Sequence, residues 1–186
     1  MVIKIKKISE DLQVTIPDLI TRPIGRMMYL TVKDTLSHIR NGDGVILDFQ
    51  DIRVMDPSFI DEFIVKLILD SREGESVFFL KLSNLSDSAE INIDSVFSSY
   101  YSFQNVKLVI ITDSLMSNNS YYIGNLSDVE RDIIGYMNVN KVASSGDVAS
   151  FLGEHSDTVS VLLDGLYKLR VLRKEVDNQS ELYLAV

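Results

Sequence analysis

Residues 44–67, GVILDFQDIRVMDPSFIDEFIVKL, carry the clearest structural pattern of the N-terminal part of the chain. The first six of them, 44–49, are almost all apolar, which is typical of a strand buried on both faces of a sheet. Asp56 and Pro57 then predict a helix start, because aspartate caps exposed N–H groups and proline fits the first helical turn. Apolar residues at helical spacing follow and predict one broad buried face, made of Phe59, Ile60, Phe63, Ile64, Leu67 and Ile68.

The segments around this unit extend the alternation of strands and helices over residues 1–112. We expect, in chain order, strands at residues 2–8 and 13–16 joined by a turn at 9–11, a helix over 21–40, the strand at 44–49, the helix from residue 57, a strand at 76–82, a helix over 88–101 and a strand at 106–112. Thr21 is the expected cap of the helix over 21–40, with Arg22 and Pro23 in its first turn. This order predicts an α/β domain in which helices pack on a mixed sheet.

The composition changes after residue 112. Residues 113–125 are rich in Ser, Asn, Tyr and Gly, and predict a linker. Residues 126–186 then predict helices at 126–137, 145–152 and 156–170, followed by strands at 171–176 and 181–186 around a turn at 177–180. Three helices followed by a two-stranded ribbon predict an α+β winged-helix domain.

Local signals mark the ends and inner faces of these C-terminal helices. Ser127 and Glu130 fit a capping box, and Gly153 fits the left-handed position after a helix. The expected inner faces consist of Val129, Ile133, Ile134 and Met137 in the first helix and of Val159, Leu162, Leu163, Leu166 and Leu169 in the third.

The charge and composition exclude several classes of protein. The net charge is −9, and residues 126–186 contain six basic and ten acidic residues, so neither part has the basic excess of a protein that wraps nucleic acid. The chain has no cysteine, which excludes disulfides, thiolate chemistry and cysteine-ligated metals. The N-terminus lacks the apolar run of a signal peptide, and no run of 18 apolar residues suits a membrane span. We therefore expect a cytoplasmic protein.

No set of residues predicts catalysis. His38 and His155 lie in different predicted domains without metal-ligand spacing to other candidates, and there is no glycine-rich phosphate loop. We therefore expect no enzyme activity, no metal and no cofactor. Asp48, at the end of a buried strand, suggests a receiver domain, with Glu10 and Asp11 as its acid pair. However, residues 109–115 offer no lysine and a second strand precedes the first helix, so we favour Asp48 as the cap of the following loop.

Residues 44–67, together with TRPIGRMMYLTVKDTL at 21–36, resemble STAS-like domains, including a family of unassigned function. The resemblance implies that Ser58 matches the serine phosphorylated in anti-sigma-factor antagonists and that Asp56 matches the acid just before it. It also implies a kinase or an anti-sigma-like protein as partner. Pro57 stands where those antagonists usually have serine or threonine, and Phe59 where they have glycine.

The physical chemistry of Ser58 fits two interpretations. A phosphate at a helix start gains about 0.3–1 kcal/mol from the helix dipole. It also adds negative charge near Asp56, Asp61 and Glu62, and this repulsion would dislodge a bound partner. In the alternative interpretation Ser58 is simply a helix-start residue.

Residues 126–186 resemble a MarR- or ArsR-type winged helix, with DTVSVLLDGLYKL at 157–169 as the recognition helix. Its expected outward positions are Asp157, Ser160, Val161, Asp164, Gly165 and Lys168. DNA readers place Arg, Asn, Gln or Lys at such positions, whereas aspartates repel phosphates. Positive charge gathers instead at Lys168, Arg170, Arg173 and Lys174.

These observations leave two functions open. In the first, the protein is a transcription-regulator module whose winged helix binds duplex DNA weakly through Ser160 and the four basic residues, while the STAS-like domain receives a signal or partner. A homodimer would bring two basic edges to one duplex. In the second, the protein is a partner-switching or scaffold protein whose winged helix binds protein.

Overall fold

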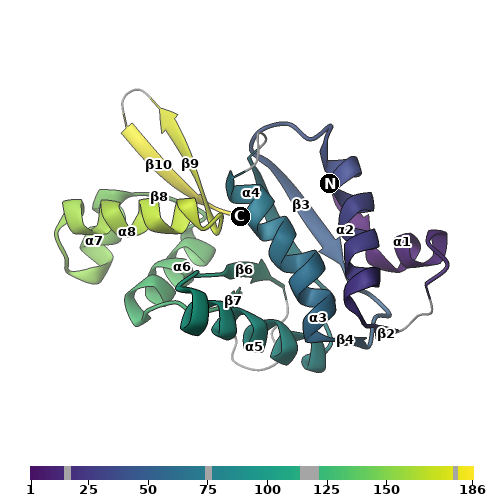
Figure 1. Ribbon diagram of the computed structural model, residues 1–186. Coiled ribbons are helices and arrows are strands. Elements are labelled where there is room, and N and C mark those ends of the chain that lie inside the picture. Colours follow the sequence, from purple (N-terminus) through teal and green to yellow (C-terminus); the bar gives the residue numbers. More distant parts are fainter. Residues whose placement is uncertain (15–17, 74–76, 114–121, 178–179) are drawn as a thin grey trace. The chain divides into compact units, whose positions relative to one another are not determined.

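The computed structural model describes residues 1–14, 18–73, 77–113, 122–177 and 180–186 (Figure 1). The chain divides into two compact units, an N-terminal unit of Met1–Asn125 and a C-terminal unit of Leu126–Val186.

A five-stranded mixed sheet forms the centre of the N-terminal unit (Figure 1). Its strands are β1 (Val2–Lys4), β3 (Asp43–Asp48), β5 (Phe78–Ser83), β6 (Val109–Thr112) and β7 (Tyr122–Gly124), in the order β1-β3-β5-β6-β7. The first four are parallel to their neighbours, and β7 is antiparallel to β6. The mixed sheet with packed helices is confirmed.

Helices supply most of the remaining core of this unit. They are α1 (Ile5–Asp11), α2 (Arg22–Leu36), α3 (Pro57–Ile60), a π-helix (Asp61–Val65), α4 (Lys66–Glu73) and α5 (Asp87–Gln104). The six apolar residues predicted as the buried face of the helix from residue 57 are all buried in the core. The helix itself is continuous from Pro57 to Glu73 but widens into a π-turn between α3 and α4.

The predicted N-terminal hairpin is wrong. Strand β1 ends at Lys4, pairs in parallel with β3, and leads directly into α1. The alternation of Ile and Lys at the start suggested a longer strand, but Ile5 and Ser9 are spaced four residues apart and are both buried on one helical face. Of the second predicted strand, Gln13 and Val14 are not in a strand, and residues 15–17 lie outside the described residues.

The helix expected over 21–40 also differs in its ends. Helix α2 stops at Leu36, where Ser37 bonds back to the carbonyl of Asp34 through both its N–H and its hydroxyl. Thr21 precedes the helix with a φ of 82° and makes no side-chain cap. Its backbone N–H instead donates to the carboxylate of Asp56, 3.3 Å away.

Part of the predicted linker belongs to the sheet. Residues 122–124 form β7, with Tyr122 opposite Ile111 and Gly124 opposite Val109. Gly124 has a φ of 121°, and a Cβ there would lie 2.2 Å from the carbonyl oxygen of Leu108, so this edge requires glycine. Residues 114–121 lie outside the described residues.

The C-terminal unit contains three helices and a three-stranded antiparallel sheet (Figure 1). In chain order these are α6 (Asp128–Asn140), β8 (Val142–Ser144), α7 (Ser145–Leu152), α8 (Ser156–Lys168), β9 (Leu172–Asp177) and β10 (Ser180–Ala185). The three predicted helices and the two predicted strands are confirmed, whereas β8, only three residues long, was not predicted. It lies beside β10, on the side opposite β9.

Most of the local signals in this unit act as expected. Ser127 and Glu130 form the capping box, and Gly153 ends α7 in the left-handed conformation. The expected inner faces are also buried, except that Leu162 and Leu169 are only partly covered and Val129 is 41% exposed. Val129 is in the first turn of α6, one turn before Ile133, where the buried face of the helix begins.

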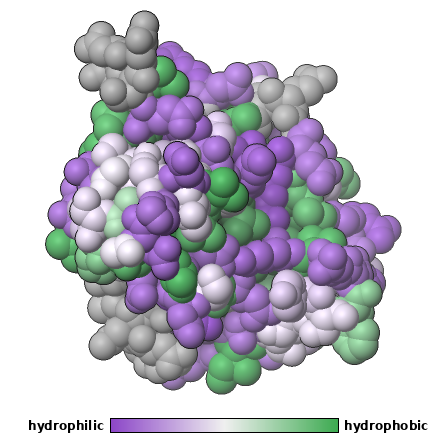
Figure 2. All heavy atoms as spheres, turned by 90° about the vertical axis from the view of Figure 1, so that its left-hand side faces the viewer, coloured by the Kyte–Doolittle hydropathy of each residue, from purple (hydrophilic) through white to green (hydrophobic). Residues whose placement is uncertain are grey.

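The surface has no large apolar sector in the view of Figure 2, where hydrophilic residues predominate and hydrophobic ones form small separate groups. None of the helices in the described ranges combines the length and the apolar character needed to cross a membrane.

Candidate functional site

Asp56 organises the start of the helix that carries Ser58. Its carboxylate accepts a hydrogen bond from the backbone N–H of Phe59 at 2.7 Å, as predicted for a helix cap. The same carboxylate accepts from the N–H of Thr21 and from the hydroxyl of Ser58, the latter at 3.0 Å. One carboxylate therefore fixes the start of α3, the chain entering α2, and the orientation of the Ser58 hydroxyl.

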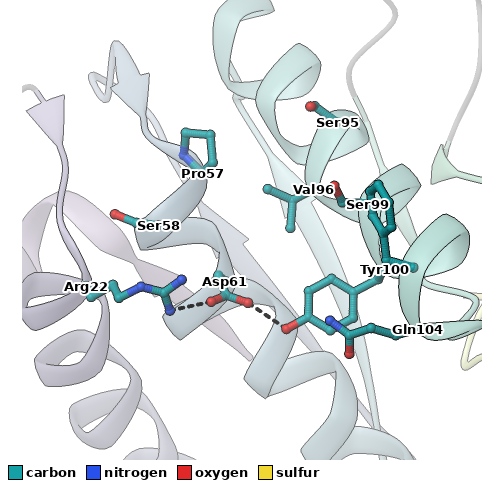
Figure 3. A pocket seen from close by; sticks show the side chains of 10 residues that line it. Arg22, Pro57, Ser58, Asp61, Ser95, Val96, Ser99, Tyr100 and Gln104 are labelled. Carbon is teal, nitrogen blue, oxygen red and sulfur yellow. Dashed lines mark hydrogen bonds and ion pairs between the residues drawn. The ribbon is translucent and has the colours of Figure 1, made fainter.

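Ser58 lies on the wall of an open pocket of about 490 Å³ between α3 and α5 (Figure 3). The pocket is lined by Arg22 from the start of α2, by Pro57, Ser58 and Asp61 from the neighbouring helix start, and by Ser95, Val96, Ser99, Tyr100, Phe103 and Gln104 from α5. A volume of this size is in the range of natural ligand and side-chain pockets. Of these residues, the sequence indicated Ser58 as a candidate site and Asp61 as an acid near it.

Asp61 connects the two walls of the pocket (Figure 3). One carboxylate oxygen accepts from the guanidinium of Arg22, and the other accepts from the hydroxyl of Tyr100 at 2.6 Å. Burial, together with the bond to Asp61, raises the pKa of Tyr100 to about 12. The phenol therefore remains a donor at neutral pH, and the bridge from α2 through the π-helix to α5 stays intact.

Glu62, the next residue, is a buried carboxylate surrounded by cations. It is 6% exposed and contacts Lys66 at 2.5 Å, Arg22 at 3.2 Å and Arg26 at 3.4 Å. Hydrogen bonds, first from Lys66 and then from Arg26, lower the pKa of Glu62 to about 2. A π-turn is frequent at functional sites, and here it carries both acids that hold Arg22 beside the pocket.

Gly25 allows α2 to approach this helix closely. A Cβ at Gly25 would lie 2.9 Å from the carbonyl oxygen of Phe59 and 3.0 Å from the Cβ of Glu62. Any larger residue would push α2 away from the π-helix and so lengthen the contacts made by Arg22 and Arg26.

Asp48 caps the loop after β3, as favoured from the sequence. Its carboxylate accepts from the N–H of Gln50 at 3.0 Å and from the side-chain amide of Asn84 at 2.8 Å. In the ranges that the structure describes, no three His, Cys, Asp or Glu side chains are grouped to hold a metal ion. Asp48 and the pair Glu10 and Asp11 therefore do not form the acidic cluster of a receiver. The argument from a second strand before the first helix fails, because α1 follows β1 directly.

In the C-terminal unit, Lys174 is not part of an open basic edge. Its ammonium contacts carboxylate oxygens of Asp164 and Glu181, each at 2.8 Å, and its side chain is only 18% exposed. It also lies over the ring of Tyr183, whose hydroxyl donates to Asp164 at 2.8 Å. The bond to Asp164 raises the pKa of Lys174, and burial raises that of Tyr183. This closed network, made of Asp164, Lys174, Glu181 and Tyr183, attaches α8 to the hairpin β9–β10.

The other proposed contact residues are not gathered in one exposed cluster. Lys168 is exposed at the end of α8, whereas Ser160 and Arg173 are half-buried. Arg170 is half-buried, and its guanidinium lies 5.2 Å from the ring of Tyr167 and donates to the carbonyl of that residue. On the outward side of α8 a large hydrophobic side chain, Val161, is 72% exposed.

Comparison with known families supports one part of the resemblance. Residues 30–90 match a STAS-like domain of unknown function (DUF4325). This STAS-like segment runs from the middle of α2 into the first turn of α5 and includes Asp56, Ser58 and Asp61. The match does not reach residues 126–186, so the MarR or ArsR resemblance gains no support from it. No curated protein matches the chain.

Proposed function

We propose that this protein is a non-enzymatic regulator that binds a protein partner through the face of the N-terminal unit that carries Ser58 and the pocket. The observation that carries the proposal is the position of Ser58. Ser58 belongs to the STAS-like segment and lines the open pocket, and its hydroxyl donates to the same carboxylate that fixes the starts of two helices. A negative charge added at this hydroxyl therefore lies at the pocket and next to the carboxylate that fixes the two helix starts.

Phosphorylation of Ser58 by a kinase is the proposed switch. The modified serine no longer donates to Asp56, and its phosphate lies close to that carboxylate and in the same pocket as Asp61. Arg22 is the one cationic side chain among the described residues that line the pocket, and it is already paired with Asp61 and Glu62. The added charge is therefore poorly compensated, which favours release of the partner.

The C-terminal unit acts in this proposal as a winged-helix module that binds protein. The order helix, strand, two helices and hairpin supports the assignment to this class. Two observations favour protein over DNA: Lys174 is held by two carboxylates, and the outward side of α8 presents Asp157 and Val161. Such a surface repels phosphates and offers an apolar contact to a protein.

DNA binding by this module is the second candidate function. It is favoured by the element order and by the cations Lys168, Arg170 and Arg173 near the end of α8 and the start of the hairpin. A homodimer would present two such sets to one duplex. This candidate requires binding to random duplex DNA that weakens steeply as salt is raised.

The proposal is tested by the proteins that co-purify with the full-length chain and with Ser58→Asp and Ser58→Ala variants. We expect a partner on the parent chain and on Ser58→Ala, and its loss on Ser58→Asp, because only the aspartate adds charge next to Asp56. A partner retained equally by all three proteins would contradict the proposed switch. Circular dichroism of each variant confirms that the fold is intact.

A further inference from the structure

We propose that the pocket receives an arginine or lysine side chain of the partner, from a basic segment that lies along α5. This inference rests on the proposed function and specifies the chemistry of the partner at the same site. It follows from the charge of α5, from the apolar side chains that α5 exposes, and from the hydrogen-bonding groups left unused in the pocket.

Helix α5, one wall of the pocket, is entirely acidic in its charged residues. It contains Asp87, Glu90 and Asp94 and no lysine or arginine over its 18 residues. Asp87 and Asp94 are exposed. None of these three acids lines the pocket, so they act at longer range: complementary charge steers a basic segment toward α5 and disfavours an acidic one.

The same helix exposes large apolar side chains. Phe103, on the pocket wall, is 87% exposed, and Ile91, one turn before Ser95 on the same side of the helix, is 66% exposed. Aromatic side chains that are exposed in the free protein are frequent anchors of protein interfaces. They extend the contact well beyond the pocket, which indicates a protein segment as the occupant.

The pocket offers acceptors for a cationic head. In the described part of the chain the side chains of Ser95, Ser99 and Gln104 make no hydrogen bond, and all three line the pocket (Figure 3). Asp61 stands between the walls, with Tyr100 holding one oxygen. A guanidinium has five N–H donors for these oxygens, and its apolar stem fits against Val96 and the ring of Phe103.

An anion is a poorer occupant of this space. Arg22 is already paired with two carboxylates, and an incoming phosphate or carboxylate group would lie between Asp61 and the acidic helix. A cation instead shares Asp61 with Arg22 and gains the attraction of α5.

The test is an NMR titration of the labelled full-length chain with N-acetyl-arginine amide. N-acetyl-citrulline amide is its neutral match, and inorganic phosphate is the anionic probe. We expect the arginine derivative to shift the amide resonances of Ser95, Ser99 and Phe103, with citrulline binding at least about 5-fold more weakly, because the charge is lost. Equal binding of citrulline, or shifts of these resonances by phosphate that vanish in Arg22→Gln, would overturn the inference.

A matched pair of variants locates the effect. Asp61→Asn is expected to weaken the arginine derivative about 5-fold or more, because the anchoring charge is removed. Asp70→Asn is the control: Asp70 likewise accepts from a tyrosine hydroxyl and a cation, those of Tyr29 and Lys33, but does not line the pocket. Equal weakening by both variants would show that the probe does not bind at Asp61, and would overturn the inference.

The outcome is separable from that of the proposed function. If a partner is lost on Ser58→Asp while the arginine derivative fails to bind, the regulator proposal stands and the basic-segment inference is wrong. If the arginine derivative binds but no partner responds to Ser58→Asp, the pocket has the inferred chemistry and the proposed switch is wrong.

Discussion

Asp61 in the N-terminal unit and Asp164 in the C-terminal unit have the same kinds of bonding partners but lie in different surroundings. Each accepts a hydrogen bond from a tyrosine hydroxyl and pairs with one basic side chain. Asp61 makes these bonds across an open pocket, whose neighbouring polar groups remain unused. Asp164 makes them above Tyr183, which is fully buried, and the basic partner there is held by a second carboxylate.

The difference shows that an acid–base–tyrosine set does not by itself mark a binding site. What matters is whether its hydrogen-bonding capacity is used up within the fold. At Lys174 the charge is satisfied by two carboxylates, so little attraction is left for a phosphate. At Asp61 unused acceptors lie nearby, and these are the groups that the proposed partner would contact.

The largest effect on stability is expected from breaking the ion network next to Asp61. The substitution Glu62→Gln leaves three cations without their buried carboxylate. We expect the free energy of unfolding at pH 7 to fall by about 2–3 kcal/mol, a loss that is limited because the cations are partly solvated. Urea unfolding followed by circular dichroism measures it. Glu73→Gln, at an exposed carboxylate outside the network, is the control and should change stability little.

This loss has a defined pH dependence. Because the folded pKa of Glu62 is lowered to about 2, its contribution is fully present above the unfolded value of 4.5 and disappears as the pH falls toward 2. The parent protein and Glu62→Gln should therefore converge in stability between these values. A constant difference over this range would show that the charge of Glu62 is not the cause.

A slightly smaller effect is expected from separating the helices that hold the open site. Gly25→Ala places a methyl group against the backbone of Phe59, and we expect a loss of about 2 kcal/mol. Gly135→Ala is the matched control, because nothing lies within 4 Å of its Cβ position on α6, and it should gain about 0.5–1 kcal/mol. An equal gain in the free energy of unfolding for Gly25→Ala and Gly135→Ala would contradict the close packing of α2 on the π-helix.

The smallest of the three effects on stability is expected at the closed network. Lys174→Met leaves Asp164 and Glu181 close together without a cation, and we expect a loss of about 1–2 kcal/mol, because both acids are partly exposed. Faster amide hydrogen exchange in β9 and β10 reports it. Lys168→Met removes an exposed lysine from the end of α8 and should leave this exchange unchanged.

The parts of the fold that could be predicted are those specified by local patterns. The apolar repeat from Phe59 to Ile68 predicted the buried helix face, and the Asp56-Pro57 pair predicted its start. The prediction of the N-terminal hairpin was wrong because the sequence IKI fits a strand, while Ile5 and Ser9 also fit one face of a helix. Tertiary packing decides between the two structures. Strand β8 is three residues long, which is too short for an alternation of apolar and polar residues to predict it.

The candidate site could be predicted only in part. Ser58 and Asp56 follow from the helix start, but Arg22 and Tyr100 each meet Asp61 from 39 residues away, and nothing local signals either contact. The clustering of basic residues near the end of α8 suggested an open edge that includes Lys174. The register of the predicted hairpin argues against such an open edge. It places Lys174 opposite Tyr183, which is buried, and so on the buried side of the ribbon.

We propose protein partners for this molecule, and cations of its C-terminal unit such as Lys174 and Arg170 are used within the fold. Fluorescence anisotropy of the full-length chain with a random DNA duplex at 50 and 200 mM salt tests this proposal most directly. We predict no salt-dependent binding. Binding at 50 mM that falls about 40-fold at 200 mM, as three phosphate contacts would give, and that disappears in Arg173→Glu, would contradict it.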